Sequence, residues 1–395
     1  MIDFDPHSHA LQDDPYPVYG KLRDESPVLH VEELGFWAIS SYHEVKTALL
    51  QPSRFSSMRS LDGSDPSAKT PMIVILDPPR HGELRSLLNR AFTPRRVSDL
   101  ERRIRKITTD LIDAFIETGR CDLWRDLAAP LPTIVIAELL GIPSEDREMF
   151  KEKSTAIAAT VGPAMKLNPG LGSSGKHPVM ELGAYLAKAF EEKRKNPGDD
   201  LMSALLAAEI DGRRLSQVEL VGFAVLLLIA GNETTTNLIS NGVALLDRHP
   251  DQRTRLLEDP SRIAVGIEEF VRFESPVQGL ERIVTEEVTI GSEKLHRGDK
   301  VFLMLGSANR DERTFENPNR LDVGRDPNPH LGFGFGAHFC LGASLARLEA
   351  RIACEEILRR LPDYRVSGPS QRLYSGAFRG LLSLPLEFDS QSRAA

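Results

Sequence analysis

The stretch Phe333-Gly-Phe-Gly-Ala-His-Phe-Cys340-Leu-Gly342 decides how the rest of this sequence is interpreted. Glycines at 332, 334, 336 and 342 remove side chains on both sides of one cysteine, so backbone there can approach a flat or bulky group. Residues 343–361 have the apolar spacing of a long helix. A cysteine just before a helix amino terminus is near amide donors that favour its thiolate. We therefore interpret Cys340 as the ligand of a large planar cofactor; a buried structural cysteine is the alternative.

A second unusual feature lies within the longest helical pattern, residues 216–246. Its apolar run is interrupted by Ala230-Gly231-Asn232-Glu233-Thr234, although glycine, acids and hydroxyls are unfavourable inside a helix. A hydroxyl that bonds to the carbonyl four residues earlier, beside a glycine, can bend or open a helix. An opened turn with an acid and a hydroxyl can move protons next to a buried reactive centre. The alternative is a loop between two helices, which the helical periodicity on both sides disfavours.

Composition and charge restrict the class of protein. The chain has 395 residues, of which 41% are hydrophobic and 27% charged, as in ordinary globular proteins. Its net charge of −8 gives no reason to expect a nucleic acid partner. Three cysteines without CxxC spacing argue against a zinc site or a disulfide framework. The amino terminus has no targeting pattern, and the longest apolar run, residues 223–230, is far shorter than the ~20 residues of a membrane span, so we expect a cytoplasmic protein.

The pattern along the chain predicts a mainly helical fold with a minor β portion. Neither a repeat nor a linker divides it, so we expect one domain over residues 1–395. Helix starts are indicated by Ser41-x-x-Glu44, Thr93-Pro94 and Ser216-x-x-Glu219. Helices are expected over residues 100–116, 130–140, 180–193, 216–247, 264–273 and 341–361, and strands over 28–31, 36–39, 283–290, 300–305 and 379–388. Residues 56–71 and 162–178 are rich in helix breakers and are interpreted as substrate-access loops, with plain surface loops as the alternative.

Together these motifs resemble the cytochrome P-450 superfamily, soluble bacterial type, over nearly the whole chain. The resemblance is carried by Phe333-x-x-Gly336-x-x-x-Cys340-x-Gly342 (haem-binding loop), Ala230-Gly231-x-Glu233-Thr234 (oxygen-binding helix) and Glu269-x-x-Arg272 (internal ion pair). That pair alone would be a weak signal, because most such pairs are surface salt bridges. In the family an arginine of a later Pro-x-Arg segment usually completes it, here Pro318-Asn319-Arg320.

The resemblance implies a fold, a cofactor and site residues. The fold would be the cytochrome P-450 fold, one large triangular helical domain with small sheets. The cofactor would be haem b with Cys340 as its axial ligand, and basic residues would hold its propionates. The candidates for this grip are His81, Arg85, Arg282 and His338. Thr234 would hold bound dioxygen and Glu233 would relay protons, which makes the enzyme a monooxygenase.

The resemblance also implies partners. Electrons would come from NAD(P)H through a reductase and a ferredoxin, because the chain has no flavin or iron–sulfur motif. Residues 80–106 hold nine Lys/Arg against three Asp/Glu, either a solvated helix face or a docking site. Candidate docking residues are Arg95, Arg96, Arg102 and Arg103.

The substrate is expected to be a small or medium hydrophobic molecule, and tailoring of natural products is the favoured role. From the family layout, its pocket would include Leu227, Gly279, Leu280, Ala377 and Phe378. Two alternatives stay open. A peroxygenase of the same fold would use hydrogen peroxide, and a non-catalytic haem protein would carry haem without turnover. The Glu233–Thr234 pair argues against both.

Overall fold

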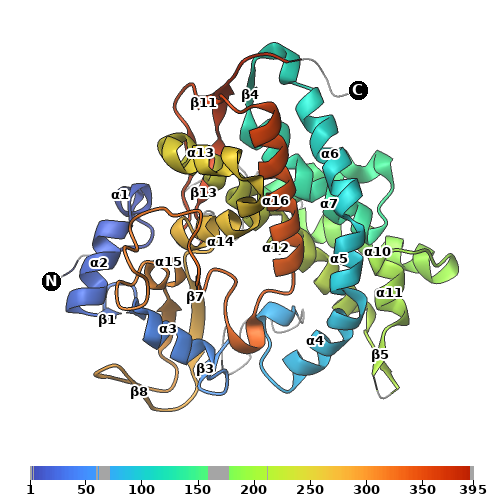
Figure 1. The fold of residues 1–395 in the computed structure, drawn as a ribbon. Helices are drawn as coiled ribbons and strands as arrows, with labels where there is room; N and C mark the ends of the chain where they lie inside the picture. The colour runs from blue at the N-terminus through green and yellow to red at the C-terminus, as the bar shows by residue number, and fades with distance from the viewer. Residues whose placement is uncertain are drawn as a thin grey trace.

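The structure is a computed structural model that describes residues 2, 4–58, 61, 72–158, 178–210 and 212–391. Figure 1 shows the amino-terminal helices and most strands on one side and the longer helices on the other. The α-helices are α1 (His9–Asp13), α2 (Tyr16–Glu25), α3 (Tyr42–Leu49), α4 (Arg80–Ala91), α5 (Pro94–Asp99), α6 (Glu101–Asp113), α7 (Pro130–Leu140), α8 (Arg147–Ala158), α10 (Pro178–Lys195), α11 (Leu201–Ala207), α12 (Gln217–Arg248), α13 (Pro250–Glu258), α14 (Ile263–Phe273), α15 (Leu305–Ala308) and α16 (Ala343–Arg360). Short helical turns are η2 (Ile73–Ile75), η3 (Ile116–Thr118), η4 (Trp124–Ala128), η5 (Ser144–Asp146), η6 (Pro260–Arg262) and η7 (Gly336–His338).

The strands in the described part of the chain form one larger sheet and four small ones. The larger sheet has the order β1 (Val28–Val31), β2 (Phe36–Ile39), β10 (Lys300–Leu303), β7 (Leu280–Val284) and β3 (Phe55–Ser56). Its pairs are antiparallel except β2 with β10, which are parallel with Val301 opposite Trp37. The smaller sheets are β11 (Arg365–Val366) with β14 (Pro385–Glu387) and β4 (Arg120–Asp122), β12 (Gln371–Leu373) with β13 (Gly380–Ser383), β5 (Glu209–Ile210) with β6 (Arg213–Arg214), and β8 (Val288–Ile290) with β9 (Glu293–Leu295).

Two of the three predicted helix caps are confirmed. At the start of α12 the Ser216 hydroxyl accepts from the Glu219 amide, and the Glu219 carboxylate accepts from the Ser216 amide at 2.8 Å. Thr93 caps α5 by accepting from the Arg96 amide at 3.3 Å. At Ser41 the predicted helix start is confirmed, because Ser41 is the N-cap of α3, but the capping box that the Ser41-x-x-Glu44 pattern predicts is absent. The Ser41 hydroxyl donates to the Glu44 carboxylate and accepts no helix amide. The amide of Tyr42, in the first turn of α3, donates instead to the Asp311 carboxylate at 2.8 Å.

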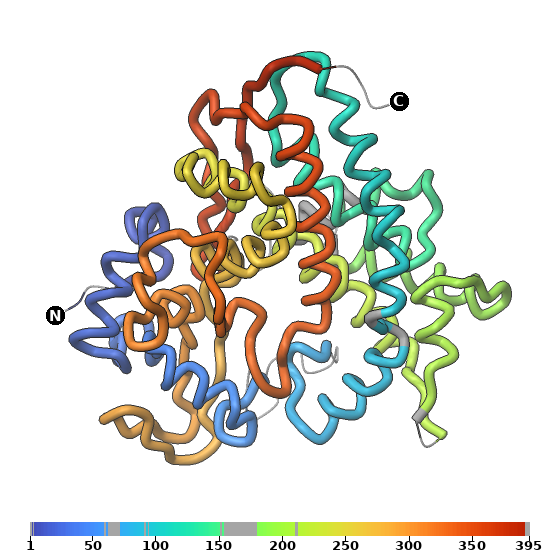
Figure 2. Tube along the Cα trace, viewed as in Figure 1, coloured from blue at the N-terminus to red at the C-terminus, as the bar shows by residue number. Residues whose placement is uncertain are grey.

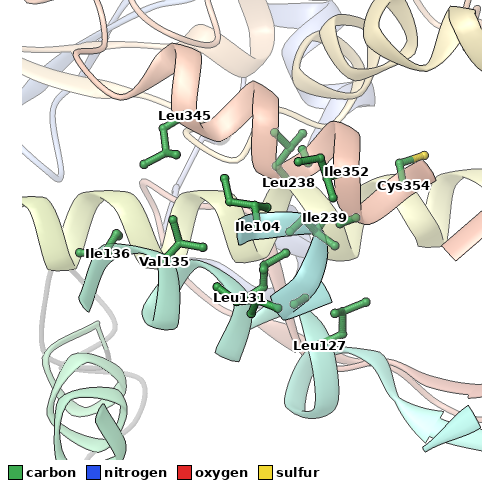
Figure 3. Packing of buried hydrophobic residues seen from close by; sticks show 14 of the residues in the cluster. Ile104, Leu127, Leu131, Val135, Ile136, Leu238, Ile239, Leu345, Ile352 and Cys354 are labelled. Atoms are coloured by element: carbon green, nitrogen blue, oxygen red, sulfur yellow. The ribbon is translucent and has the colours of Figure 1, made fainter. Parts of the chain in front are cut away.

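The core is built around α12, which runs between α7 on one side and α16 on the other (Figure 3). Apolar residues from five elements meet there and exclude water, which supplies most of the stabilisation. The labelled members are Ile104 of α6, Leu127 of η4, Leu131, Val135 and Ile136 of α7, Leu238 and Ile239 of α12, and Leu345, Ile352 and Cys354 of α16. Among the described residues α12 is the one helix long and apolar enough to cross a membrane, and here it is the central helix of this core.

The loop with the cysteine lies at one edge of this core. Residues 331–342 connect the region after the larger sheet to the start of α16, and η7 within this loop packs against α3 (Figure 2). Of the predicted substrate-access loops, residues 162–177 lie outside the described residues. For the first loop the structure describes only residues 56–58 and 61.

Candidate functional site

Cys340 sits in a tight loop, three residues before the first residue of α16, Ala343. Its amide donates to the Phe333 carbonyl at 2.9 Å, and the amide of Gly334 donates to Leu331 at 2.8 Å. Gly334 and Gly336 have positive φ angles of 71° and 68°, a conformation that favours glycine. Of the three cysteines Cys340 alone is only partly buried, so its sulfur is the one available to a ligand.

The charge of the Cys340 sulfur is set by opposing effects. Burial raises the pKa of Cys340, while the amides of Gly342 and Ala343 and the guanidinium of Arg85 lower it. The amides therefore act as the sequence predicted, but burial outweighs them and the free thiol is the favoured form. A coordinating metal ion deprotonates a thiol outright. Ligation is thus what would make this residue a thiolate.

The glycines around Cys340 are glycine for different structural reasons. A Cβ at Gly332 would lie 2.4 Å from Val271, and one at Gly336 would lie 2.9 Å from the carbonyl oxygen of Leu49. Both glycines are therefore needed for packing against the protein itself, whereas their role in letting the backbone approach a cofactor stays a prediction. A Cβ at Gly342 meets nothing within 4 Å. Packing against the protein therefore does not require glycine at position 342.

The polar interruption of α12 is helical throughout. The Thr234 hydroxyl donates to the Ala230 carbonyl at 2.6 Å, as predicted, but α12 continues without an opened turn, so the predicted opening is wrong. The loop alternative is likewise excluded. Gly231 allows close packing, since its Cβ would lie 2.6 Å from Ile136 of α7. Ala230 is exposed although it lies mid-way along the central core helix, and Glu233 and Thr234 are partly exposed. We call residues 226–234, where this side of α12 is accessible, the α12 window.

The Glu233 carboxyl is suited to proton transfer near neutral pH. Desolvation by burial raises the pKa of Glu233 to about 7. A carboxyl group with this pKa can both give and take a proton at physiological pH, which is the requirement for general acid–base catalysis. Because burial is the cause, the value depends on the protein around α12 and not on a charged neighbour.

The four basic residues that the sequence predicted as a propionate grip lie close together. The rings of His81 and His338 are 4.0 Å apart. Burial, followed by the charges of His81, Arg282 and Arg85, lowers the pKa of His338 to about 3. Burial lowers the pKa of Arg282 to about 10, and the charge of Asp77 opposes this shift. Basic neighbours lower the pKa values of His81 and His338. Positive charge gathered in this way is stabilised by anions, and the two carboxylates of a haem edge would supply them. The residues present therefore fit haem.

One anchor of this cluster was missed at the sequence level. The Ser57 hydroxyl lies 3.0 Å from Nε2 of His338, and the Ser57 amide donates to Asp77 at 2.8 Å. Ser57 connects the end of β3 to both residues. A lone serine in a breaker-rich segment has no pattern that could have revealed this contact.

The internal ion pair of Glu269 and Arg272 is completely buried. Its atoms Oε2 and Nε are 2.7 Å apart, and both side chains have no exposed surface. The second guanidinium comes from Arg325, whose Nε is 3.1 Å from Glu269. The prediction that Arg320 completes the pair is wrong, because the Arg320 residue is exposed and offers only its backbone carbonyl to Arg272. Arg272 also donates to the carbonyl of Pro318, which fixes the segment preceding the cysteine loop.

The predicted pocket segments meet in space. The amide of Gln278, just before Gly279 and Leu280, donates to the carbonyl of Ala377 at 2.7 Å, and Phe378 forms a β-bridge with Val277. A further predicted pocket residue, Leu227, lies in the α12 window and is partly exposed. Their contact with a substrate stays a prediction.

Comparison with known proteins gives a consistent picture. The family model "Cytochrome P450" matches residues 27–266 and 263–362. A curated relative, vitamin D(3) 25-hydroxylase of Pseudonocardia autotrophica, is 41% identical over 98% of this chain and 97% of its own length. The crystal structure of CYP109E1 from Bacillus megaterium in complex with testosterone has a TM-score of 0.86 and 39% identity, and covers 95% of this chain and 99% of that one. The cytochrome P450 PksS of the Bacillus subtilis 168 bacillaene polyketide synthase has a TM-score of 0.90 and 36% identity, and the match covers 98% of this chain and 100% of that one.

Proposed function

Since this chain belongs to the cytochrome P450 family and is an enzyme of its monooxygenase class, we propose that it inserts one oxygen atom of O2 into a small or medium hydrophobic molecule. Haem held by a cysteine thiolate supplies the cleavage of the O–O bond and the oxidising power. The observation that carries the proposal is the basic cluster of His81, Arg85, Arg282 and His338 near Cys340, in which the carboxylate of Asp77 acts on His81 and Arg282.

In this proposal each residue of the chain has a defined task. Cys340 would ligate the haem iron, and its loop is held by the bond from its amide to the Phe333 carbonyl. The four basic residues would bind the propionates, and Gly336, Ala230 and Gly231 would leave room for the cofactor. Thr234 would bind oxygen through its hydroxyl, which would have to leave the Ala230 carbonyl to do so. Glu233, with a pKa of about 7, holds the proton that is delivered there.

The electron donor is proposed to be a ferredoxin that receives electrons from NAD(P)H through a reductase. The candidate docking residues differ in their freedom to bind it. Arg103 forms a two-bond pair with Glu138, and Arg96 is 3.7 Å from Asp199. Arg95 and Arg102 are exposed and have no ion-pair partner among the described residues. They are the stronger candidates, because a free surface charge steers an acidic partner better than a neutralised one.

The substrate class follows from the relatives in coarse terms. One relative is named for hydroxylation of vitamin D(3), one similar structure holds testosterone, and another belongs to a polyketide synthase. We therefore propose an apolar substrate of roughly this kind, including intermediates of secondary metabolism. It would lie between the α12 window and the segments at Gly279, Leu280, Ala377 and Phe378. We further propose that residues 1–395 form one cytoplasmic domain and that residues 56–71 and 162–178 are its substrate-access loops.

The decisive experiment is the absorption spectrum of the reduced, carbon monoxide-bound protein. The purified protein and its Cys340→Ser variant are compared. A strongly red-shifted Soret band that is lost in the variant is expected. A band at the position of histidine-ligated haem, or the absence of haem, would overturn the proposal. If the band is present but hydrogen peroxide alone supports turnover as well as O2 with electrons does, the peroxygenase alternative replaces the monooxygenase.

A further inference from the structure

Arg379 connects the predicted substrate pocket to the amino terminus of the chain. Its Nε donates to Glu274 at 2.6 Å, and its guanidinium also donates to the backbone carbonyls of Gln12 at 2.5 Å and Asp13 at 3.3 Å. Arg379 and Glu274 are 6% and 4% exposed, so this pair is almost entirely screened from water. Helix α1, which contains Gln12 and Asp13, is therefore tied to the residue that directly follows Ala377 and Phe378.

The turn before Arg379 is fixed on a second side by main-chain bonds. The Arg379 amide donates to Pro276 at 2.9 Å, and the Gln278 amide donates to Ala377 at 2.7 Å. These bonds make one ribbon of two segments that are about a hundred residues apart in sequence. A displacement of Arg379 must therefore also move Gln278 and the pocket residues that follow it.

The same ribbon is pressed against α12. A Cβ at Gly380 would lie only 1.9 Å from Oδ1 of Asn237, so backbone and helix touch there. Asn241, one turn further along, donates to the carbonyl of Arg379 at 3.0 Å. Asn237 lies three residues after Thr234, which is about 4.5 Å along the helix and on the same face. Phe378 is two residues from Gly380, or about 7 Å of extended chain. The turn therefore borders the α12 window.

The outer surface of the turn is covered by the amino-terminal segment. The rings of His9 and Tyr374 are stacked 4.0 Å apart with an angle of 8° between their planes, and the Tyr374 hydroxyl donates to Asp13 at 3.1 Å. The Arg379 guanidinium lies 5.4 Å from the ring centre of Tyr16 in α2. A buried charge with this many partners has one favoured position, because any shift leaves polar groups unpaired.

We propose that Arg379 and Glu274 are positioning residues of the substrate pocket, through which helix α1 sets where Ala377 and Phe378 stand relative to the α12 window. The inference rests on the proposed function, because it assumes that Ala377 and Phe378 face the substrate. It assigns a role in selectivity to the first helix of the chain, far from Cys340 in sequence. Neither Arg379 nor Glu274 touches the reacting atoms.

The test uses the haem-loaded protein and four variants. Arg379→Met removes the tether and leaves Glu274 buried without its partner, which can by itself impair folding. The double variant Glu274→Gln/Arg379→Met removes both charges, so no carboxylate is left without Arg379, and Arg310, which Glu274 also stabilises, keeps its contacts with the rings of Tyr16 and Phe273. Arg379→Lys keeps the positive charge but loses the planar set of N–H donors of the guanidinium. The control is Arg365→Met, which breaks the exposed pair of Arg365 with Glu387.

Two measurements separate this inference from the proposed function. The first is hydrogen–deuterium exchange of peptides covering residues 4–14 and 373–383, which needs no turnover. Exchange should rise at least about tenfold in the double variant and stay within about twofold of wild type in the control. The second is the affinity for imidazole and for 4-phenylimidazole, read from the Soret band. Both ligate haem iron, but only the phenyl ring reaches the pocket wall.

The expected result is a change of about tenfold in the ratio of the two dissociation constants in the double variant, a smaller change in Arg379→Lys, and none in the control. Wild-type exchange and a wild-type ratio in a double variant with a normal haem band would overturn the inference. Faster exchange with an unchanged ratio would also overturn it, because the tether would then be purely structural. Absence of the red-shifted band in the wild-type protein would refute the proposed function, and the inference with it.

Discussion

Glu349 of α16 gives a test of the electrostatics of the core. The residue is 1% exposed, and its Oε2 has no hydrogen-bond partner among the described residues. Burial raises the pKa of Glu349 well above its ordinary value. Leaving a polar group buried and unpaired costs about 1–3 kcal/mol. Glu349→Met keeps a similar volume without the polar atoms, so we expect it to increase the free energy of unfolding by about 1–3 kcal/mol at pH 8.

The pH dependence of this gain has a definite sign. In the folded protein the pKa of Glu349 is raised, so the folded state holds its proton more tightly than the unfolded chain, whose glutamates titrate near about 4.3. The contribution of Glu349 to stability is therefore fully present below that unfolded value and is lost as the pH rises toward the folded-state pKa. The advantage of Glu349→Met over wild type should accordingly be larger at pH 8 than at pH 5.

Urea unfolding of the haem-loaded proteins, followed by circular dichroism at pH 5 and pH 8, measures both effects. Equal slopes of free energy against urea are required for the comparison. Glu349→Gln is the matched variant, because it keeps a polar group that does not titrate. Its free energy of unfolding should depend less on pH than that of wild type, and should increase less than that of Glu349→Met. A Glu349→Met protein that is less stable than wild type at both pH values would refute the reasoning, because the carboxyl would then have a stabilising partner.

Three further predictions follow from the site. Arg325→Ala should lower the free energy of unfolding by about 1.5–3 kcal/mol, because it removes a hydrogen bond to the buried carboxylate of Glu269. Arg320→Ala should change it by less than about 0.5 kcal/mol. Urea unfolding of both variants decides which arginine completes the pair. Glu233→Gln should lower kcat about 100-fold and remove an ionisation near pH 7 from the pH profile of kcat, and a profile that keeps this ionisation would assign it to another group. Charge reversal at Arg95 and Arg102 should slow reduction by ferredoxin in stopped-flow measurements, and the difference from wild type should shrink as salt is added; equal rates at low salt would exclude these residues from docking.

Periodicity and caps located the helices well because both are local properties. The expected helix over residues 264–273 is α14, Ile263–Phe273, and that over 216–247 is α12, Gln217–Arg248. Strands were placed less accurately where their partners change. The single strand expected over residues 379–388 is two strands, β13 and β14, which pair in different sheets. Between them the carbonyl of Leu384 accepts from the Leu123 amide. Which sheet a strand joins depends on residues far away in the chain, and its own pattern does not contain that information.

In the candidate site, too, the sequence indicates which types of residue take part but not which residues contact each other. The residue types needed for the chemistry could be found in the sequence, because Cys340 and Glu233 stand out from their surroundings. The residue that serves as a partner could not be found in this way. Arg320 and Arg325 both follow the same proline and carry the same charge, so a motif alone does not distinguish them. The fold decides by burial: Arg325 reaches Glu269, whereas Arg320 turns to solvent and leaves only its carbonyl inside. Since a buried carboxylate with too few donors is costly, the arginine that reaches it is the one that the fold requires.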